Sequence, residues 1–274
     1  MNSEDYFIKC ISQNSTLIGD DGAVIDDLIY SKDAFFEDIH FKREWLSPYQ
    51  IASKAMMVNI SDAVAMNAKP KYALICVAMP KSLSKHDMSE LARGFLESAK
   101  DFDIEIIGGD TIANTKLDIT LTIISESKRP LLRSGLKSGD LIAHTGVLGS
   151  SKRDLKRLLS GAKLHHKSRF ISLHIRDKFI YKTSHLLRAG MDISDGLFSD
   201  MRKLSVINRC GFDFDKKISK HIGCSGEEYE MLIAFSKRNK KSVIRRAKQL
   251  RVGLNIFASV KRGSFKNTCK AHHF

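Results

Sequence analysis

The stretch PYQIASKAMMVNISDAVAMNA, residues 48–68, has the length and the apolar spacing of a helix packed into a core. In a helical register, one stripe carries Ile51, Ala55, Val58, Asp62 and Ala65, spaced four and three positions apart. A carboxylate without a partner on a buried stripe is costly, so Asp62 needs a cation or a hydrogen-bond donor. Asn59 lies one turn away and is a candidate donor. We interpret Asp62 as a metal ligand.

Alternating strands and helices surround this helix. Apolar or alternating runs predict strands over 27–36, 71–80, 104–110 and 117–124, and a second helix is expected over 84–103, with Ser84 as its N-cap. The segment 126–140 carries Pro, Gly and mixed charge and marks a domain boundary. A strand over 140–146 and a helix over 151–161 open the second half. The pattern predicts two mixed α/β or α+β domains, 1–130 and 131–274.

Composition favours a water-soluble cytoplasmic protein. The chain has 274 residues, of which 43% are hydrophobic, enough for substantial cores. No apolar run is long enough to cross a membrane, and the N-terminus lacks the build of a secretory signal. The five dispersed cysteines include no C-x-x-C pair, so reduced thiols are expected rather than disulfides or a zinc site.

Charge is divided unevenly between the two halves. Residues 1–125 contain 12 Lys and Arg against 19 Asp and Glu, whereas residues 126–274 contain 33 against 12. Such asymmetry is a known indication of nucleic-acid or polyanion binding. The basic segment 237–251 also reads as a solvated helix, because Val243, Ala247 and Leu250 form an apolar stripe.

Aspartates next to glycines recur along the chain, in IGDDGAV (18–24), IIGGDT (106–111) and MDISDGL (191–197). Surface turns or helix caps explain some of these acids. Mg²⁺ ions explain the set as well, because hard cations take carboxylate oxygens and glycines let backbone approach a phosphate. The P-loop, the protein-kinase motifs and the G-x-S-x-G elbow are all missing from the sequence. The remaining pattern suits several Mg²⁺ ions on a triphosphate.

The sequence resembles the thiamine-monophosphate kinase family of the aminoimidazole ribonucleotide synthetase-like superfamily. Seven blocks carry the resemblance in the family's order: GDDGAV (19–24), SKDAFFEDIHF (31–41), KAMMVNISDAVAMNAKP (54–70), IIGGDT (106–111), LLRSGLKSGDLIAHTGVLGSS (131–151), MDISDGLFSDM (191–201) and GEEYEML (226–232). The resemblance implies a mixed α/β N-terminal domain whose strands form a barrel shared by a homodimer, and an α+β C-terminal domain. It also implies transfer of the γ-phosphoryl group of ATP to thiamine monophosphate, giving thiamine diphosphate.

The resemblance further implies a set of site residues. The expected Mg²⁺ ligands are Asp21, Ser31, Asp33, Asp62, Asp110, Asp192 and Asp195. The expected ATP contacts are Gly109, Asp110, Arg133 and Ser194, and the expected substrate contacts are His40 and Glu227. Such a transfer needs no general base, since the attacking phosphate oxygen is already deprotonated, and metals with Arg133 would offset the charge of the phosphates.

Two positions depart from the family pattern. The family's S-T-D is Ser31-Lys32-Asp33 here, so an ammonium either serves a phosphate or marks a lost metal site. Ala271 aligns where the family has an aromatic residue against the thiamine rings.

Two alternative functions stay open at the level of the sequence. One is an ATP-dependent synthetase of the same superfamily with another acceptor. The other is a non-catalytic nucleotide-binding or nucleic-acid-binding protein, although nucleic-acid binding leaves the ordered aspartates unexplained. A membrane partner is not expected.

Overall fold

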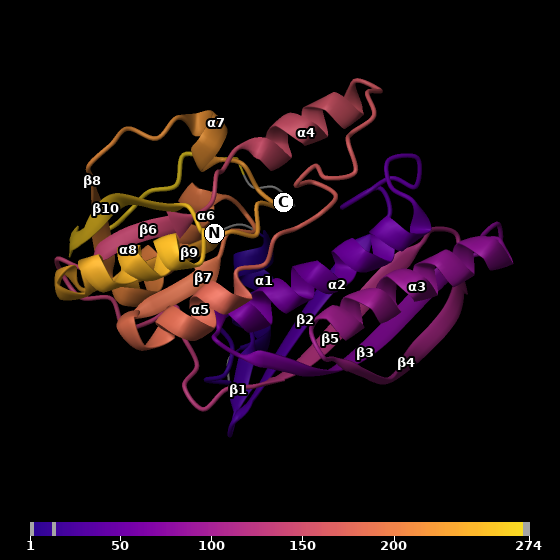
Figure 1. Ribbon diagram of the computed structural model, residues 1–274, viewed down its shortest axis with the longest axis horizontal. Helices are drawn as coiled ribbons and strands as arrows, with labels where there is room; N and C mark the ends of the chain where they lie inside the picture. Colours follow the sequence, from indigo (N-terminus) through magenta and orange to yellow (C-terminus); the bar gives the residue numbers. More distant parts are fainter. Residues whose placement is uncertain (1–2, 13–14, 271–274) are drawn as a thin grey trace.

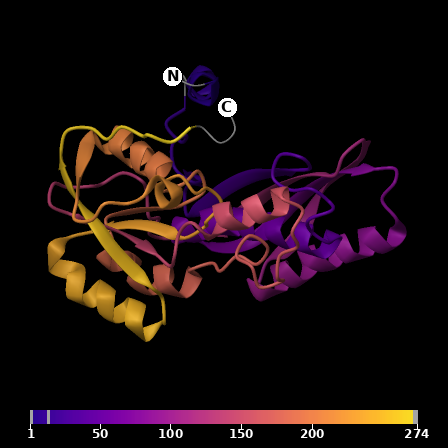
Figure 2. The same ribbon diagram turned by 90° about the horizontal axis from the view of Figure 1, so that it is seen from above.

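Two five-stranded sheets, one in each half of the chain, lie side by side along the longest axis of the molecule (Figure 1, Figure 2). The computed structural model describes residues 3–12 and 15–270. The first half contains α1 (Ser3–Ile11), β1 (Ala23–Ile25), β2 (Leu28–Phe36), α2 (Pro48–Ala65), β3 (Lys69–Pro80), α3 (Lys85–Asp101), β4 (Glu105–Asn114) and β5 (Asp118–Glu126). The second half contains β6 (Leu141–Thr145), α4 (Ser150–Leu159), α5 (Asp177–Thr183), the 3₁₀ turn η1 (Ser184–Leu186), β7 (Ala189–Asp192), α6 (Leu197–Asn208), β8 (Cys210–Phe214), α7 (Lys220–Gly223), β9 (Met231–Phe235), η2 (Lys237–Asn239), α8 (Lys240–Gln249) and β10 (Leu254–Arg262).

The first sheet has the strand order β1-β2-β5-β3-β4, with β3 and β4 parallel and the other pairs antiparallel. Helices α2 and α3 cover one face of it (Figure 1). Their close approach requires Gly94 on α3, because a Cβ there would lie 2.4 Å from the Tyr49 carbonyl oxygen. Strand β4 forms one edge of the sheet, and most of its residues are exposed.

Helix α2 is the central element of the molecule. Ser47 and Gln50 form a capping box at its start, and Pro48 occupies the first turn, where a missing N–H costs nothing. Asn67, in the left-handed region at φ 55°, follows its end. The helix packs on α3, on β2 and β5 of its own sheet, and on α5 and β7 of the second half. One hydrophobic core therefore continues from the first half into the second.

The second sheet is antiparallel throughout, in the order β7-β9-β6-β10-β8. Alternate residues of β9 enter two cores: Met231, Ile233 and Phe235 join the core shared with α2, and Leu232 and Ala234 join the core under α6. Helix α8 buries Val243 and Ala247 and leaves its basic residues toward solvent. The basic segment is thus an amphipathic helix with one buried stripe.

The predicted mixed α/β and α+β architecture is confirmed, with element ends that shift by a few residues. Helix α2 ends at Ala65 rather than 68, and β4 continues to Asn114 beyond the predicted 110. Ser84 caps α3 as predicted, because its side chain accepts a hydrogen bond from the Asp87 N–H. Among the described residues, no helix has the length and hydropathy to cross a membrane.

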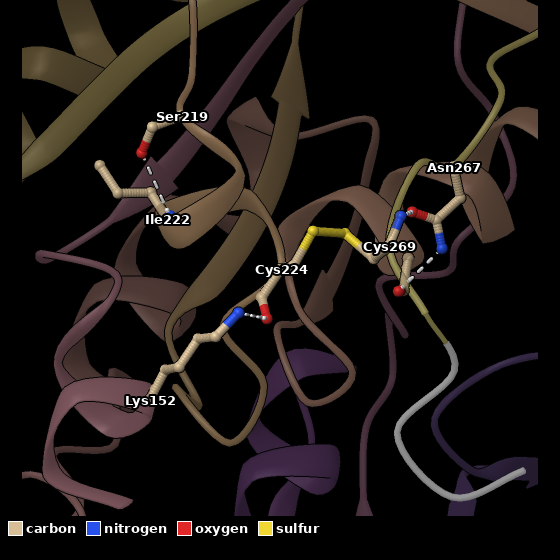
Figure 3. The surroundings of a disulfide bond; sticks show 7 residues. Lys152, Ser219, Ile222, Cys224, Asn267 and Cys269 are labelled. Atoms are coloured by element: carbon tan, nitrogen blue, oxygen red, sulfur yellow. Dashed lines mark hydrogen bonds between the residues drawn. A yellow bond between two sulfur atoms is a disulfide. The ribbon is translucent and has the colours of Figure 1, made fainter. Parts of the chain in front are cut away.

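The cysteine prediction was wrong for one pair. Cys224 and Cys269, 45 positions apart in sequence, form a disulfide with Cα atoms 5.5 Å apart (Figure 3). Cys10, Cys76 and Cys210 are free. Spacing along the chain could not show this pair, because the return of the chain after β10 brings the two residues together. The cysteine argument for a reducing compartment therefore no longer applies.

Candidate functional site

Three of the predicted metal ligands converge between the two halves. Asp21 precedes β1, Asp62 lies in the last turn of α2, and Asp192 ends β7. One carboxylate oxygen of each lies within 4.8 Å of the others. Because α2 packs on both β2 and β7, it brings acids from distant parts of the sequence to one point.

The carboxylates of this acid cluster (Asp21, Asp62 and Asp192) repel one another in a site with little water. Burial is the main cause that raises the pKa of each above its usual value, and the neighbouring carboxylates raise the pKa of Asp62 further. Asp33 on β2 shares a hydrogen bond with Asp62, and burial raises the pKa of Asp33 to about 6. Without a cation, this site therefore favours carboxyl groups that keep or share protons.

Oxygen atoms of the acid cluster are available to a cation. Asp21 Oδ2 and Asp192 Oδ1 are buried and have no hydrogen-bond partner among the described residues. Asp192 Oδ2 accepts a hydrogen bond of 2.6 Å from the Ser61 hydroxyl, which orients that carboxylate. Crowded carboxylates with unpartnered oxygens are the donor set that Mg²⁺ takes, so the residues fit such an ion.

Ser31 lies next to the acid cluster, on the same face of β2 as Asp33. Its hydroxyl donates to Asn59 Oδ1 at 2.5 Å, and Asn59 in turn donates to the Leu121 carbonyl oxygen at 2.7 Å. Asn59 therefore anchors α2 to β2 and β5. The partner of Asp62 is Asp33, not Asn59.

Two basic side chains border the acid cluster. The Arg133 guanidinium pairs with Asp21, and the backbone N–H of Arg133 donates to Asp20 Oδ1 at 2.6 Å. Lys203 on α6 lies 2.6 Å from Asp195 Oδ2 and 3.1 Å from Asp200 Oδ1. The predicted ligand Asp195 thus shares the Lys203 ammonium with Asp200. Asp200 is fully buried, and burial raises its pKa to about 7.

Asp110 does not join the acid cluster within one chain. It lies on β4, and β3 and β5 separate β4 from β2, which carries Asp33. Its side chain accepts a hydrogen bond from the Thr111 N–H. Gly109 has a packing role here, since a Cβ would lie 1.7 Å from the Ile75 carbonyl oxygen of β3.

Lys32 points away from the acid cluster. It is exposed on the face of β2 opposite Ser31 and Asp33, and its ammonium donates to the Thr120 hydroxyl at 3.2 Å. Ala271 lies outside the described residues.

The two predicted substrate contacts lie on opposite halves of the molecule. The His40 ring stacks on Phe35 with centroids 5.6 Å apart, and its Nδ1 accepts a hydrogen bond from the Phe36 N–H. Glu227 precedes β9, and its backbone N–H donates to the Ser194 carbonyl oxygen at 2.7 Å. Glu227 is therefore attached to the turn that carries the predicted ATP contact Ser194.

Two features of this region were missed from the sequence. Lys54 of α2 pairs with Glu227, and Arg169 and Arg176 both pair with the buried Glu230. Lys54 lies three residues after Ile51 and four before Val58, the same spacing that singled out Asp62, so the signal was available. Nothing in the local sequence indicates the arginine pairs, because they depend on the path of the chain between α4 and α5.

Comparisons with known proteins identify the family. Residues 19–126 match the model of "AIR synthase related protein, N-terminal domain". Over 258 residues the chain is 33% identical to thiamine-monophosphate kinase of Buchnera aphidicola subsp. Schizaphis graminum, covering 82% of this chain and 78% of that one. It is 35% identical over 205 residues to thiamine-monophosphate kinase of Bacillus subtilis, covering 69% of this chain and 63% of that one.

Solved structures show the same fold. Thiamine monophosphate kinase from Aquifex aeolicus superposes with a TM-score of 0.84 at 22% identity, over 98% of this chain and all of that one. The structure described as AaThiL complexed with AMPPCP and TMP gives a TM-score of 0.86 at 23% identity, over 97% and 94%. The hydrogenase maturation protein HypE of E. coli gives 0.72 at 15% identity, over 96% and 93%. Together with the seven sequence blocks and the acid cluster, these matches show that the chain belongs to the thiamine-monophosphate kinase family.

Proposed function

We propose that this protein transfers the γ-phosphoryl group of ATP directly to thiamine monophosphate, in a Mg²⁺-dependent reaction that yields thiamine diphosphate. Membership of the family supports this function, as does the name of a similar structure described as complexed with AMPPCP and TMP. The observation that carries it is the acid cluster, in which three carboxylates from three elements meet with unpartnered oxygens. A purely structural cluster of this kind would be costly.

We infer that Asp21, Asp62 and Asp192 of the acid cluster would hold Mg²⁺. Ser31, Asp33 and Asp195 remain proposed as further ligands from the same chain. Bound Mg²⁺ would neutralise the charge of the phosphates that meet in the reaction. Arg133, which pairs with Asp21, and Ser194, two residues after Asp192, would bind and orient ATP. His40 and Glu227 would hold thiamine monophosphate near the end of α2 that lies away from the acid cluster. The acceptor is a phosphate oxygen that is deprotonated at neutral pH, so these residues need only bind and align the reactants.

We also propose a homodimer formed through β4 and the open face of the first sheet. Tyr72, Leu74, Ile107 and Ile112 are large apolar side chains exposed on the neighbouring strands β3 and β4, and β4 is an edge strand of the sheet. A second copy would cover this surface and bring its own Gly109 and Asp110 to the site of its partner. The exposed position of Asp110, apart from its own acid cluster, supports this arrangement.

The test is an assay of purified protein with ATP, Mg²⁺ and thiamine monophosphate, with thiamine diphosphate read by chromatography. Formation of the diphosphate is expected with thiamine monophosphate but not with free thiamine, and not after removal of Mg²⁺ with a chelator. Absence of the diphosphate while ATP still binds would contradict the proposal. That result would favour another acceptor within the superfamily or a non-catalytic nucleotide-binding protein.

A further inference from the structure

Lys54 is the one lysine among the described residues that is buried, with a relative exposure of 1%. Its ammonium lies 2.8 Å from Glu227 Oε2, a residue 173 positions away on the other half of the chain. The Phe170 ring packs against it with its centroid 3.9 Å from Nζ, and the Phe35 ring lies on another side at 5.6 Å. An ammonium enclosed in this way is stable only while its carboxylate partner stays in place.

Glu227 is held in an uncommon backbone conformation. Its φ is 54° and that of Tyr229 is 49°, both in the left-handed region that residues with a Cβ seldom adopt. Hydrogen bonds from Glu227 N–H to the Ser194 carbonyl oxygen and from Tyr229 N–H to that of Ile193 fix this segment to the turn after β7. The side chain of Glu227 is a quarter exposed, so the ion pair with Lys54 is what directs it inward rather than toward water.

Lys54 also borders the other end of the substrate site. The Phe35 ring, whose centroid lies 5.6 Å from the ammonium, also stacks on the His40 ring. Lys54 therefore pairs directly with one predicted substrate contact, Glu227, and lies near the ring that stacks on the other, His40. The two contacts come from different halves of the molecule. Helix α2 also carries Ser61 and Asp62 two turns further on, so the same helix connects the substrate end to the acid cluster.

We propose that Lys54 is a positioning residue that sets the spacing between Glu227 and His40 and thereby the affinity for the organic cation end of the acceptor. The inference rests on the proposed function, because it takes thiamine monophosphate as the ligand between these two residues. It predicts that loss of the ammonium weakens the binding of the acceptor far more than the binding of ATP. ATP belongs to the acid cluster at the other end of α2.

The experiment compares Lys54→Met, Glu227→Gln and the double variant with the wild type. Calorimetry gives the Kd for thiamine monophosphate, and steady-state kinetics give the KM for each substrate. Lys54→Met should raise the Kd and KM for thiamine monophosphate about tenfold or more while the KM for ATP stays within about twofold. The double variant should bind no more weakly than Glu227→Gln alone, because the two side chains act as one unit.

Lys71→Met is the matched control. Lys71 forms an exposed ion pair of 3.9 Å with Glu126 at the start of β3, and its replacement should change neither KM. Circular dichroism and thermal unfolding identify variants that fail to fold. If Lys54→Met does not fold, the test uses the double variant Lys54→Leu/Glu227→Leu, which removes both charges. Its Kd for thiamine monophosphate is compared with that of Glu227→Gln, and it should again bind no more weakly.

The outcomes separate the two proposals. A wild type that converts thiamine monophosphate, with a folded Lys54→Met variant of unchanged KM, would overturn the role of Lys54 and leave the function intact. Equal increases in the KM for both substrates, or additive effects in the double variant, would reduce Lys54 to a structural residue. A wild type that neither binds nor converts thiamine monophosphate would end both proposals.

Discussion

At the scale of single residues, the acid cluster makes opposite predictions for activity and for stability. Asp62→Ala and Asp192→Ala each remove one carboxylate of a crowded set, so turnover should fall at least about a hundredfold. The free energy of unfolding without Mg²⁺ should stay the same or rise, because repulsion between buried carboxylates is relieved. Kinetics and denaturant unfolding check the two effects separately.

Asp213→Asn is the control for these variants. Asp213 is exposed on β8, away from the acid cluster, and its loss should change neither quantity. Turnover close to that of the wild type in Asp62→Ala or Asp192→Ala would remove the metal assignment.

His144 on β6 should make the free energy of unfolding depend on pH. Burial lowers the pKa of its imidazole below the usual value of 6.5, so the folded protein resists protonation there while the unfolded chain does not. The contribution of His144 to the free energy of unfolding should therefore decrease as pH falls below about 6.5, by up to about 1.4 kcal/mol per pH unit. Buried acids with a raised pKa, such as Asp33 and Asp200, contribute in the opposite direction over the same range, so the effect of His144 is the difference between the wild type and a variant that lacks the imidazole. Unfolding in denaturant from pH 7.5 to 5 measures the slope. Relative to the wild type, His144→Phe should lose less stability, or gain more, as the pH falls, while the exposed His86→Gln should follow the wild-type slope.

At the scale of elements, the disulfide attaches the segment after β10 to the loop that follows α7. Cys224 lies directly before the segment 225–230 that carries Glu227, and Lys152 donates to the Cys224 carbonyl oxygen at 3.5 Å (Figure 3). A closed loop of this length restricts the unfolded chain and should contribute about 2–4 kcal/mol. Cys224→Ser, Cys269→Ser and the double variant should all be less stable than the wild type by this amount.

Thiol titration under denaturing conditions tests whether the bond forms. Three thiols are expected without a reductant, and five after a dithiol reductant has been added and removed. Five thiols before reduction would contradict the pairing. Cys210→Ser provides a comparison, because it removes a buried cysteine that takes no part in the bond.

At the scale of the whole molecule, the position of Asp110 predicts that two chains complete each site. Asp62→Ala and Asp110→Ala should each be inactive alone, yet co-expressed chains that form mixed dimers should recover roughly a quarter of wild-type activity, since half of the dimers carry one intact site. Sedimentation velocity measures the dimer directly, and Ile112→Lys on the exposed edge of β4 should shift it to monomer. Dimers that show no recovery in the mixture would mean that each site is built from one chain. The division into domains 1–130 and 131–274 stays a prediction.

Local patterns along the chain are sufficient to predict most of the elements and the family resemblance. Spacing along the chain predicted α2, α3 and the strands because helices and strands impose their periods on which side chains meet the core. Blocks such as GDDGAV and MDISDGL were enough for the resemblance, and Asp62 was singled out by its place on a buried stripe. These are local properties, so they can be read without knowing where the chain goes.

Which of these residues meet depends on how the whole chain folds. The strand order of the first sheet places Asp110 three strands from Asp33, although both lie in strands that the sequence predicted. The pairs Lys54–Glu227 and Cys224–Cys269 join positions 173 and 45 residues apart, and the pairing of Lys203 with Asp195 follows from the start of α6. Contacts between distant positions depend on how helices pack on sheets and on the paths of loops. Close packing joins side chains that are neighbours in space, and local sequence patterns do not specify these neighbours.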